Sequence, residues 1–367
     1  MAKRMGIIGG GQLGRMLALS GYPLGLQFRI LEDAEEAPAG HVSPLVLGPL
    51  DHAETLDRFA EGLDCATFEF ENVPLTAIEQ LSKHVPVYPG LKALEKSQDR
   101  VVEKEFFQSL LISTAPFASV QSLEDLQQAA RSIGLPAILK TRRFGYDGKG
   151  QMRLNSALEV ANGFETLGSQ PLILEGLVPF DRELSQVSVR STKGEIRHYP
   201  LVENFHRHGI LHKTIAPAPG IGPDHPLEKQ SRQAMEKVME ALDYVGVLAI
   251  EWFQLGESLV ANEMAPRVHN SGHWTMDGAK TSQFENHVRA VLGWPLGPTD
   301  ACHFTVMLNL IGSHRPAEDW LANPGVRLHL YGKSPRKGRK LGHVNVLGNS
   351  ALEALTRSDS LLDWLAE

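Results

Sequence analysis

The sequence predicts a protein of mixed α/β and α+β class that folds as two or three domains. Its 367 residues exceed the ~150 residues of an average domain. The chain opens with a strand, a glycine-rich turn, a helix and a second strand, which is how a parallel α/β unit begins. Between residues 247 and 275, two apolar runs follow each other across a short turn, as in an antiparallel hairpin. We therefore expect both kinds of sheet in one chain.

The composition is that of a globular protein, and it argues against several functional classes. Hydrophobic residues make up 42% of the chain and charged residues 22%. The formal net charge of −7 argues against a nucleic-acid partner, because binding a phosphate backbone needs clustered Lys and Arg. Cys65 and Cys302 have no CxxC spacing, so we expect neither a disulfide framework nor a zinc site. Without an apolar run of ~20 residues or a signal peptide, no membrane segment is expected, and the predicted compartment is the cytoplasm.

Residues 9–14 form a glycine-rich turn between a predicted strand, 5–8, and a predicted helix, 15–20. The turn matches GxGxxG, and the next strand, 28–31, is followed by two acidic residues. This pattern is typical of a dinucleotide site and would suggest a NAD-dependent enzyme. The glycines and the helix N-terminus would serve any phosphate equally well, and a tight turn without a ligand has the same sequence. All three interpretations stay open on the pattern alone.

Two further acidic residues, Glu69 and Glu71, lie at the C-terminal end of the predicted strand 65–70. Open α/β sheets bind their ligands at this end of the strands, although an exposed strand end gives the same pattern. A charged amphipathic helix is predicted over 91–111, and the first domain boundary is placed at 113–116.

A second glycine-rich loop, 141–151, directly follows the strand 136–140, which ends at Lys140. The loop contains three glycines and three basic residues. Loops of this kind can close over a polyphosphate and offer it backbone N–H groups and positive charge. The spacing is not that of a Walker loop, and a solvated surface loop is the alternative.

Strands are predicted over 172–178 and 182–189. An apolar strand that leads into free backbone groups suits an adenine ring, with Glu183 available for the ribose hydroxyls, although plain sheet strands have the same periodicity. Three histidines between residues 206 and 213 favour a turn at a sheet edge over a metal cluster, because no carboxylates accompany them. The remaining predicted elements are helices at 123–133, 226–242 and 283–292, strands at 304–310, 327–331 and 344–347, and a closing helix.

The hairpin at 247–275 carries an acidic residue in each strand. If its loop is 256–258, Glu251 lies opposite Glu263, with Glu263 on the same face as Leu259 and Ala261. Two opposed carboxylates are destabilising unless a cation lies between them, which suggests a divalent metal. Solvent-facing glutamates on an ordinary hairpin are the alternative. Arginine, histidine and asparagine follow within a few residues, so we predict Mg²⁺ that bridges the protein to a phosphate.

A basic turn lies near the C-terminus, with five basic residues between 333 and 340. Because a proline and a glycine interrupt it, the segment predicts an anion site on a turn, with a solvated basic loop as the alternative.

Together, a cationic strand end, a glycine-rich closing loop, an adenine-type linker and a carboxylate pair, in this order, resemble the ATP-grasp ligases. Within them the chain is similar to the N5-carboxyaminoimidazole ribonucleotide synthetases, the ATPase subunits of phosphoribosylaminoimidazole carboxylase, from about residue 5 to 350. The motifs that carry this resemblance are GGGQLGRM at 9–16, TFEFENVP at 67–74, GYDGKGQ at 145–151, NEMAPRVHNSGHWT at 262–275 and GRKLGHVN at 338–345.

The resemblance implies an ATP-grasp fold with an N-terminal Rossmann-like (pre-ATP-grasp) domain at 1–95 and a small C-terminal subdomain at 301–367 that completes the substrate site. The ATP-grasp domain lies between them at 96–300, with a lid subdomain at about 115–178. The implied reaction is ATP-dependent carboxylation of 5-aminoimidazole ribonucleotide with bicarbonate, through carboxyphosphate, in de novo purine biosynthesis. The implied cofactor is Mg²⁺, with neither NAD nor biotin, and the implied assembly is a homodimer that binds no nucleic acid and no membrane.

The resemblance also implies roles for individual residues, and it moves His206 from a turn at a sheet edge into the ATP site. The ATP-binding set is Arg100, Lys140, Gly145, Tyr146, Asp147, Gly148, Lys149, Gly150, Gln151, Glu175, Gly176, Leu177, Val178, Glu183, His206, Asn262 and Glu263. The ribonucleotide-binding set is Gly11, Gln12, Leu13, Glu69, Glu71, Tyr146, Lys333, Arg336, Arg339 and Lys340. The catalytic set is Asp147, Lys149, Arg267, His269 and Asn270, with Asp147 as a base, and the metal ligands are Glu251 and Glu263.

Two positions depart from the family pattern, and three rival functions remain. Phe144 stands where these proteins more often have glycine, which is expected to stiffen the closing loop, and Lys337 stands where proline is common. Another ATP-dependent carboxylase or formyltransferase is the first rival, and the basic turn argues against it by indicating a nucleotide-like substrate. A NAD-dependent dehydrogenase leaves the hairpin carboxylates without a role. An ATP sensor without catalysis would require a damaged carboxylate pair.

Overall fold

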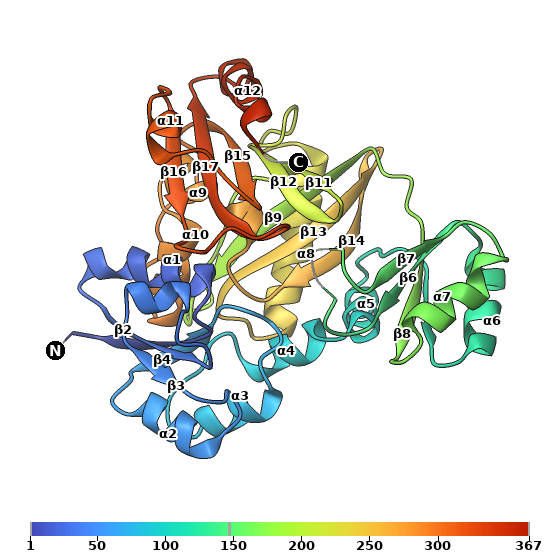
Figure 1. The fold of residues 1–367 in the computed structure, drawn as a ribbon, viewed down its shortest axis with the longest axis horizontal. Helices are drawn as coiled ribbons and strands as arrows, with labels where there is room; N and C mark the ends of the chain where they lie inside the picture. The colour runs from blue at the N-terminus through green and yellow to red at the C-terminus, as the bar shows by residue number, and fades with distance from the viewer. Residues whose placement is uncertain (1, 146–147, 366–367) are drawn as a thin grey trace.

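The computed structural model describes residues 2–145 and 148–365 and contains three β-sheets (Figure 1). The first sheet is parallel, with strand order β3-β2-β1-β4. Its strands are β1 (Arg4–Ile8), β2 (Gln27–Glu32), β3 (Leu45–Leu47) and β4 (Cys65–Phe68), and its helices are α1 (Gln12–Gly21), α2 (Ala53–Ala60) and α3 (Leu75–Leu81). The opening strand, helix and strand are confirmed, although α1 begins three residues earlier than predicted. The interior is apolar, with Ile8, Leu31 and Phe68 fully buried.

The helix predicted over 91–111 is wrong, because two helices occupy this segment. They are α4 (Leu91–Ser97) and α5 (Arg100–Ser109). Asp99 interrupts them in an extended conformation, and its carboxylate accepts a hydrogen bond from the N–H of Val101 at 3.0 Å. Aspartate favours such a helix N-cap over a helix interior, so the chain turns here and α5 starts in a new direction.

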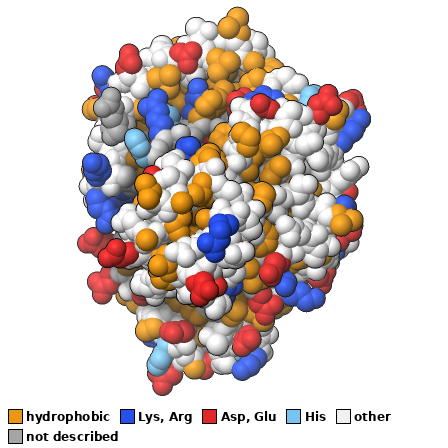
Figure 2. Space-filling model, turned by 90° about the vertical axis from the view of Figure 1, so that its right-hand side faces the viewer, with side chains coloured by type: hydrophobic (Ala, Val, Ile, Leu, Met, Phe, Trp, Pro, Cys, Tyr) orange, Lys and Arg blue, Asp and Glu red, His pale blue; other side chains and the backbone are white. Residues whose placement is uncertain are grey.

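The second sheet is a small antiparallel unit at the right of Figure 1. Its strand order is β5-β8-β6-β7, and the loop 142–150 joins two of these neighbours as the turn of a hairpin. Two helices cover one face, and the first has the predicted limits and a capping box from Ser122 and Asp125. The elements are β5 (Phe117–Val120), α6 (Leu123–Ile133), β6 (Ala137–Thr141), β7 (Gln151–Leu154), α7 (Glu159–Leu167) and β8 (Leu172–Gly176). Figure 2 faces this end of the molecule, where Lys and Arg side chains gather along one edge.

The third sheet is the largest, with order β14-β13-β9-β11-β12-β15-β17-β16 and β10 paired to β9. Its strands are β9 (Arg182–Arg190), β10 (Ile196–His198), β11 (Val202–Arg207), β12 (Ile210–Ala216), β13 (Gly246–Leu255), β14 (Ser258–Ala265), β15 (Phe304–Ile311), β16 (Val326–Leu330) and β17 (Lys340–Gly348). Because β15 pairs with β12, residues 304–348 extend the sheet of the preceding region. The domain limits drawn from the sequence stay predictions.

Helices pack on both sides of the large sheet. The predicted helices near 226 and 283 are confirmed, and the helix after the last strand also forms. The helices are α8 (Pro226–Ala241), α9 (Thr275–Gly278), α10 (Gln283–Val291), α11 (Ala317–Leu321) and α12 (Ala351–Asp359), with short 3₁₀ turns at Tyr22–Leu24, Pro38–His41, Asn270–Gly272 and Leu362–Trp364. Among the described residues, no helix has both the length and the apolar character needed to cross a bilayer.

Helix α5 has a central position in this arrangement. It lies between the small sheet and the β13–β14 edge of the large sheet (Figure 1). Its C-terminal part is anchored in the core, where Phe107 is fully buried beside residues of α8. The N-terminal turn of α5 therefore reaches the place where the three sheets approach one another.

Candidate active site

A cavity of about 620 Å³ lies between the three sheets, within the size range of small-molecule sites. Most of the predicted site residues line it, and they come from all three sheets. The predicted residues that line it are Gln12, Leu13, Glu69, Glu71, Arg100, Lys140, Gly145, Gly148, Lys149, Gln151, Leu177, Glu183, His206, Glu251, Asn262, Glu263, Arg267, His269, Asn270 and Lys340. The predicted residues that are not part of this lining are Gly11, Gly150, Glu175, Gly176, Val178, Lys333, Arg336 and Arg339. Tyr146 and Asp147 lie outside the described residues.

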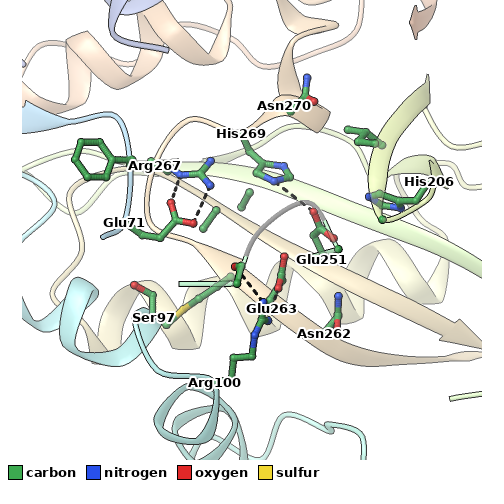
Figure 3. A pocket seen from close by; sticks show the side chains of 18 of the residues that line it. Glu71, Ser97, Arg100, His206, Glu251, Asn262, Glu263, Arg267, His269 and Asn270 are labelled. Atoms are coloured by element: carbon green, nitrogen blue, oxygen red, sulfur yellow. Dashed lines mark hydrogen bonds and ion pairs between the residues drawn. The ribbon is translucent and has the colours of Figure 1, made fainter. Parts of the chain in front are cut away.

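Glu251 and Glu263 are paired across β13 and β14, which confirms the predicted register. The turn of the hairpin and the pairing next to it differ from those predicted. The turn has only two residues, since Leu255 pairs with Ser258, and a β-bulge at Asn262 then shifts the pairing by one residue. Both Asn262 and Glu263 consequently line the cavity (Figure 3).

The predicted faces of β14 are partly wrong for the same reason. Leu259 and Ala261 pack in the core with α8, whereas Glu263 faces the cavity. A regular strand would have placed all three on one side, but the bulge exchanges the faces. The apolar residues are thereby buried without burying the carboxylate among them.

The two carboxylates differ in charge state. Burial and the neighbouring Glu263 raise the pKa of Glu251 to about 7. Burial acts in the same direction on Glu263, but the Arg100 guanidinium, 2.8 Å away, lowers the pKa of that carboxyl to about 2. His269 lies 3.3 Å from Glu251, and burial lowers the pKa of the imidazole to about 3. Of the two carboxyls, Glu263 therefore holds its negative charge more strongly than Glu251.

This donor set fits Mg²⁺ bound jointly with a phosphate. No cluster of three or more His, Cys, Asp or Glu residues suited to a metal occurs among residues 2–145 and 148–365. Mg²⁺ commonly uses one or two protein carboxylates and takes its other ligands from water and substrate phosphates. Arg100 compensates the charge of Glu263, whereas Glu251 is paired with the imidazole of His269, so the opposed carboxylates have the chemistry that a divalent cation requires.

Cationic side chains lie on the small-sheet side of the pair. Arg100 donates to Glu263 and also to the carbonyl oxygen of Gly145 at 3.3 Å, so it connects the hairpin to the glycine-rich loop. Lys140 donates to Glu175 at 3.0 Å, and Lys104 lies 3.4 Å from the same carboxylate. Burial would raise the pKa of Glu175, but the two lysines lower it.

A different set of donors lies on the opposite side, after β14. Arg267 pairs with Glu71 through two hydrogen bonds, and this ion pair is drawn in Figure 3. His269 is held by the amide of Gln283, which accepts from its backbone N–H at 2.9 Å and donates to its carbonyl oxygen at 2.6 Å. Asn270 exchanges two hydrogen bonds with Asn309 of β15. Each of these three residues is thus held by side-chain hydrogen bonds from another segment, and all three line the cavity.

Of the predicted adenine-binding residues, Leu177 lines the cavity, and so do the predicted ribose contact Glu183 and His206. Glu183 and His206 lie 2.5 Å apart, and this carboxylate raises the pKa of His206 even though burial acts in the opposite direction. The histidine segment is not at a sheet edge, since its two strands, β11 and β12, lie inside the large sheet. Phe180 and Phe253 stack with ring centroids 4.7 Å apart and provide a flat apolar wall.

The first glycine-rich turn is occupied by the protein's own carboxylates. Glu69 accepts hydrogen bonds from the N–H groups of Gly11 and Gly14, the second at 2.6 Å, and Glu32 accepts from Gly10 at 2.6 Å. The N-terminus of α1 therefore already binds a negative group, where a dinucleotide fold would hold a phosphate. Lys333 hydrogen-bonds to Gln12, so the basic turn between β16 and β17 meets this region.

Several residues that contact the site had no signal of their own in the sequence. Glu103 and Lys104 of α5 hold the β14 backbone, and Gln283 and Asn309 hold His269 and Asn270. The spacing of Glu103 and Lys104 from Arg100 on one helix would have indicated a shared face. Their partners are backbone atoms of a distant strand, and no local pattern indicates such partners.

Comparison with known proteins assigns the whole chain. Three family models match it: the ribonucleotide synthetase preATP-grasp domain at 1–98, the ATP-grasp domain at 105–284 and the phosphoribosylaminoimidazole carboxylase C-terminal domain at 305–357. An N5-carboxyaminoimidazole ribonucleotide synthase of Pseudomonas aeruginosa is 49% identical over 343 residues, which cover 94% of each chain. One of Brucella melitensis is 45% identical, over 93% of this chain and 95% of the relative.

Solved structures agree with this assignment. The N5-carboxyaminoimidazole ribonucleotide synthetase of Thermus thermophilus superposes with a TM-score of 0.95 at 51% identity over 99% of both chains. The synthase of Aspergillus clavatus in complex with ADP and 5-aminoimidazole ribonucleotide superposes with a TM-score of 0.91 at 32% identity, over 99% of this chain and 98% of that one. The chain therefore belongs to the N5-carboxyaminoimidazole ribonucleotide synthase family of ATP-grasp ligases.

Proposed function

We propose that the protein carboxylates 5-aminoimidazole ribonucleotide with bicarbonate at the expense of ATP, and that the cavity described above is the active site. A bicarbonate oxygen attacks the γ-phosphorus of ATP, which gives carboxyphosphate and ADP. The amine nitrogen then attacks the carboxyl carbon, the bond from this carbon to the phosphate oxygen breaks, and the amine loses a proton. The products are N5-carboxyaminoimidazole ribonucleotide, ADP and phosphate. The observation that carries the proposal is the opposed carboxylate pair in a cavity with separate groups of cationic donors on its two sides.

Glu251 and Glu263 are the proposed Mg²⁺ ligands. A bound Mg²⁺ would neutralise charge on the transferred phosphoryl group, which is the main chemical demand of phosphoryl transfer. Arg100 and Lys140 are the proposed contacts to the ATP phosphates, and their position on the cavity lining at the side of the small sheet supports this role. Gly145, Gly148 and Lys149 of the glycine-rich loop also line the cavity, and the loop is proposed to cover the phosphates.

Bicarbonate and carboxyphosphate would bind at Arg267, His269 and Asn270. Because burial keeps the His269 imidazole neutral, it can donate one hydrogen bond without adding a positive charge. Arg267 supplies the charge, and its ion pair with Glu71 fixes the plane of the guanidinium. Carboxyphosphate is labile in water, so a site that holds it must exclude solvent.

The ribonucleotide would bind between the N-terminal sheet and the basic turn. Lys333 contacts Gln12, and Lys340 lines the cavity, which places cationic groups beside the N-terminal sheet. Arg336 and Arg339 are the proposed remaining contacts to the 5′-phosphate. Tyr146, Asp147 and Lys149 are proposed for the meeting point of the two substrates. The homodimer and the cytoplasmic compartment stay predictions.

One experiment tests the reaction. The protein is mixed with MgATP, bicarbonate and 5-aminoimidazole ribonucleotide, and ADP release is followed with each component omitted in turn. We expect release that requires all of them. ADP release that does not respond to the ribonucleotide, at saturating bicarbonate, would reject this substrate. Replacement of the ribonucleotide by glycinamide ribonucleotide tests the rival in which another amine is acylated, and we expect no release above the rate without substrate.

A further inference from the structure

Helix α5 carries two buried ionisable residues, Glu103 and Lys104, that the reaction as proposed does not use. Their side chains are almost inaccessible, at 2% and 1% exposure. Burial raises the pKa of Glu103 to about 8 and lowers the pKa of Lys104. Burying two ionisable groups in this way is costly unless both are hydrogen-bonded. Their partners therefore indicate what the residues do.

Both residues bind the backbone of β14 on either side of Glu263. The side-chain oxygen Oε1 of Glu103 accepts a hydrogen bond from the N–H of Met264 at 2.7 Å. The ammonium group of Lys104 donates to the carbonyl oxygen of Asn262 at 3.2 Å. Arg100, on the same face of α5, contacts the side chain of Glu263 itself at 2.8 Å. One face of α5 thus contacts the side chain of Glu263 and the backbone of the residues on both sides of it, Asn262 and Met264.

The backbone groups that α5 binds are available for a structural reason. β14 is the edge strand of the large sheet, so one side of its backbone has no neighbouring strand. The bulge at Asn262 further disturbs the ladder next to Glu263. Elsewhere on this edge, the N–H groups of Leu259 and Ala261 donate to Gln230 at 3.0 Å and to the carbonyl oxygen of Ser113 at 2.8 Å. Beyond Ala261, Glu103 and Lys104 provide the contacts to the outer edge next to Glu263.

Lys104 also connects this strand to the small sheet. Its ammonium group lies 3.4 Å from Glu175 of β8, which accepts a hydrogen bond from Lys140 of β6 at 3.0 Å. The proposed metal ligand and the proposed phosphate-binding lysine are therefore linked through one buried ammonium group. Lys104 itself is not part of the cavity lining, so this link runs behind the wall of the site.

We propose that Glu103 and Lys104 are positioning residues: Glu103 sets the place of Glu263 for the metal, and Lys104 sets Glu263 and Lys140 relative to each other. The inference rests on the metal role of Glu263 in the proposed function. It differs from a purely stabilising role, because it predicts which binding step each residue controls. Glu103 acts on metal binding alone, whereas Lys104 acts on metal and on nucleotide phosphates.

The test measures metal binding directly. Mn²⁺, whose free form is visible by electron paramagnetic resonance, is titrated into protein saturated with ADP, without bicarbonate or ribonucleotide. We expect Glu103→Ala to weaken Mn²⁺ binding about 10-fold, as removal of a group behind a metal ligand typically does. Glu103→Gln keeps an acceptor oxygen for the Met264 N–H and should stay within about twofold of the wild type. Binding of ADP in EDTA should be unchanged in both variants.

A matched control separates positioning from stability. Glu228 is also a buried glutamate, at 1% exposure, and it is not part of the cavity lining. Its carboxylate accepts a hydrogen bond from the backbone N–H of Leu201 at 2.9 Å. Glu228→Ala should lower the melting temperature yet leave Mn²⁺ binding at the wild-type value. Equal Mn²⁺ affinity in Glu103→Ala and the wild type overturns the inference, and so does an equal loss in Glu228→Ala.

Lys104→Met provides a second, independent arm. Methionine fills a similar volume without an ammonium group, and we expect weaker Mn²⁺ binding together with about 5-fold weaker metal-free ADP binding, by loss of the link to Lys140. Lys237→Met is the control, because Lys237 donates to the carbonyl oxygen of Leu110 just beyond the far end of α5. If Glu103→Ala does not fold, Lys104→Met and its control Lys237→Met provide the test instead. Mn²⁺ binding by Lys104→Met with the affinity of the wild type overturns the inference.

A double variant shows whether the effect passes through Glu263. In the Glu263→Gln background, Glu103→Ala should cause no further loss of Mn²⁺ affinity, whereas an additive loss overturns the inference. A different result would reject the proposed function. Wild-type protein that binds Mn²⁺ with ADP but shows no ribonucleotide-dependent ADP release rejects the substrate and leaves the positioning role intact.

Discussion

Arg267 and Glu71 form a two-bonded ion pair between segments that are 196 residues apart in the chain. The guanidinium Nε lies 2.5 Å from one carboxylate oxygen and Nη2 lies 3.1 Å from the other. Burial favours the neutral form of Glu71, but Arg267 lowers the pKa of this carboxyl. The end of β4 therefore orients a cation that belongs to the region after β14. The N-terminal sheet thus contributes to the proposed carboxyphosphate site and not only to the ribonucleotide site.

Glu71→Gln tests this relationship. Glutamine cannot match the two-bonded carboxylate, so Arg267 should become less fixed, and we expect the KM for bicarbonate to rise about 10-fold, in line with the strength of charged hydrogen bonds. The KM for ATP should change little. Steady-state ADP release at varied bicarbonate measures both. Glu79→Gln, an exposed residue of α3, is the control, and an unchanged KM for bicarbonate in Glu71→Gln would contradict the role.

Glu263→Gln should abolish turnover, with at least ~100-fold loss of kcat, because the amide is a poor Mg²⁺ ligand and cannot offset the charge of Arg100. The fold should persist, since Glu263 faces the cavity and not the core. ADP release and the melting temperature are the measurements. Glu257→Gln changes the exposed turn of the same hairpin and should behave as the wild type. Turnover by Glu263→Gln at the wild-type rate would reject the metal role.

Protonation of His287 is expected to destabilise the folded protein at acidic pH. Its ring is buried, accepts a hydrogen bond from the Val247 N–H at 3.0 Å and contacts the Thr67 hydroxyl at 2.8 Å. Burial lowers its pKa from 6.5 to about 3, so the unfolded chain binds the proton more tightly than the folded protein. The contribution is fully present above pH 6.5 and is lost as the pH falls toward 3. At pH 5 the expected loss is about 2 kcal/mol.

Urea unfolding at pH 7 and pH 5 measures this effect. His287→Asn should be less stable than the wild type at pH 7 and should lose less stability between the two pH values. Other buried histidines also titrate in the unfolded chain, so the difference between the two proteins, and not the total loss, is the informative quantity. An identical pH dependence in both proteins would contradict the assignment.

Phe144→Gly tests the prediction that a side chain at this position stiffens the glycine-rich loop. Phe144 has a φ of 62°, and its side chain is 67% exposed at the cavity. A left-handed conformation costs a side chain about 1 kcal/mol, which glycine avoids. We expect a more adaptable loop and a kcat that rises by about twofold, if loop movement limits turnover. Leu111→Gly relieves the same kind of strain at φ 59°, outside the cavity, and should leave kcat unchanged.

The sequence allowed prediction of the parts of the site that depend on local pattern. Glycine-rich loops, strand ends and the opposed carboxylates follow from spacing, and the resemblance to a family connected them. Asp99 shows the limit, because a charged helical pattern continues through it and only its capping hydrogen bond reveals the break. Glu103, Lys104 and Gln283 show another limit, since their partners are backbone atoms contributed by tertiary contacts.

The occupation of the first glycine-rich turn could not be foreseen either. GxGxxG predicts N–H groups that face an anion, and this is correct, but the anion is Glu69 of a strand 55 residues farther along. Whether a ligand phosphate or a carboxylate binds such a turn depends on which strand lies beside it. The sequence pattern contains no information on that choice.

The bulge at Asn262 also has a consequence for the length of the hairpin. With the same two-residue turn and Asn262 removed, the ladder would run straight from Leu255 and Ser258 to the same facing pair of glutamates. The hairpin therefore has one residue more than a regular two-stranded ladder with the same turn and the same facing pair of glutamates. That insertion adds an amide side chain to the cavity wall without displacing either carboxylate. Within the described ladder, Asn262 has no partner on β13, so the extra polar group at the cavity wall comes from the residue that the ladder leaves unpaired.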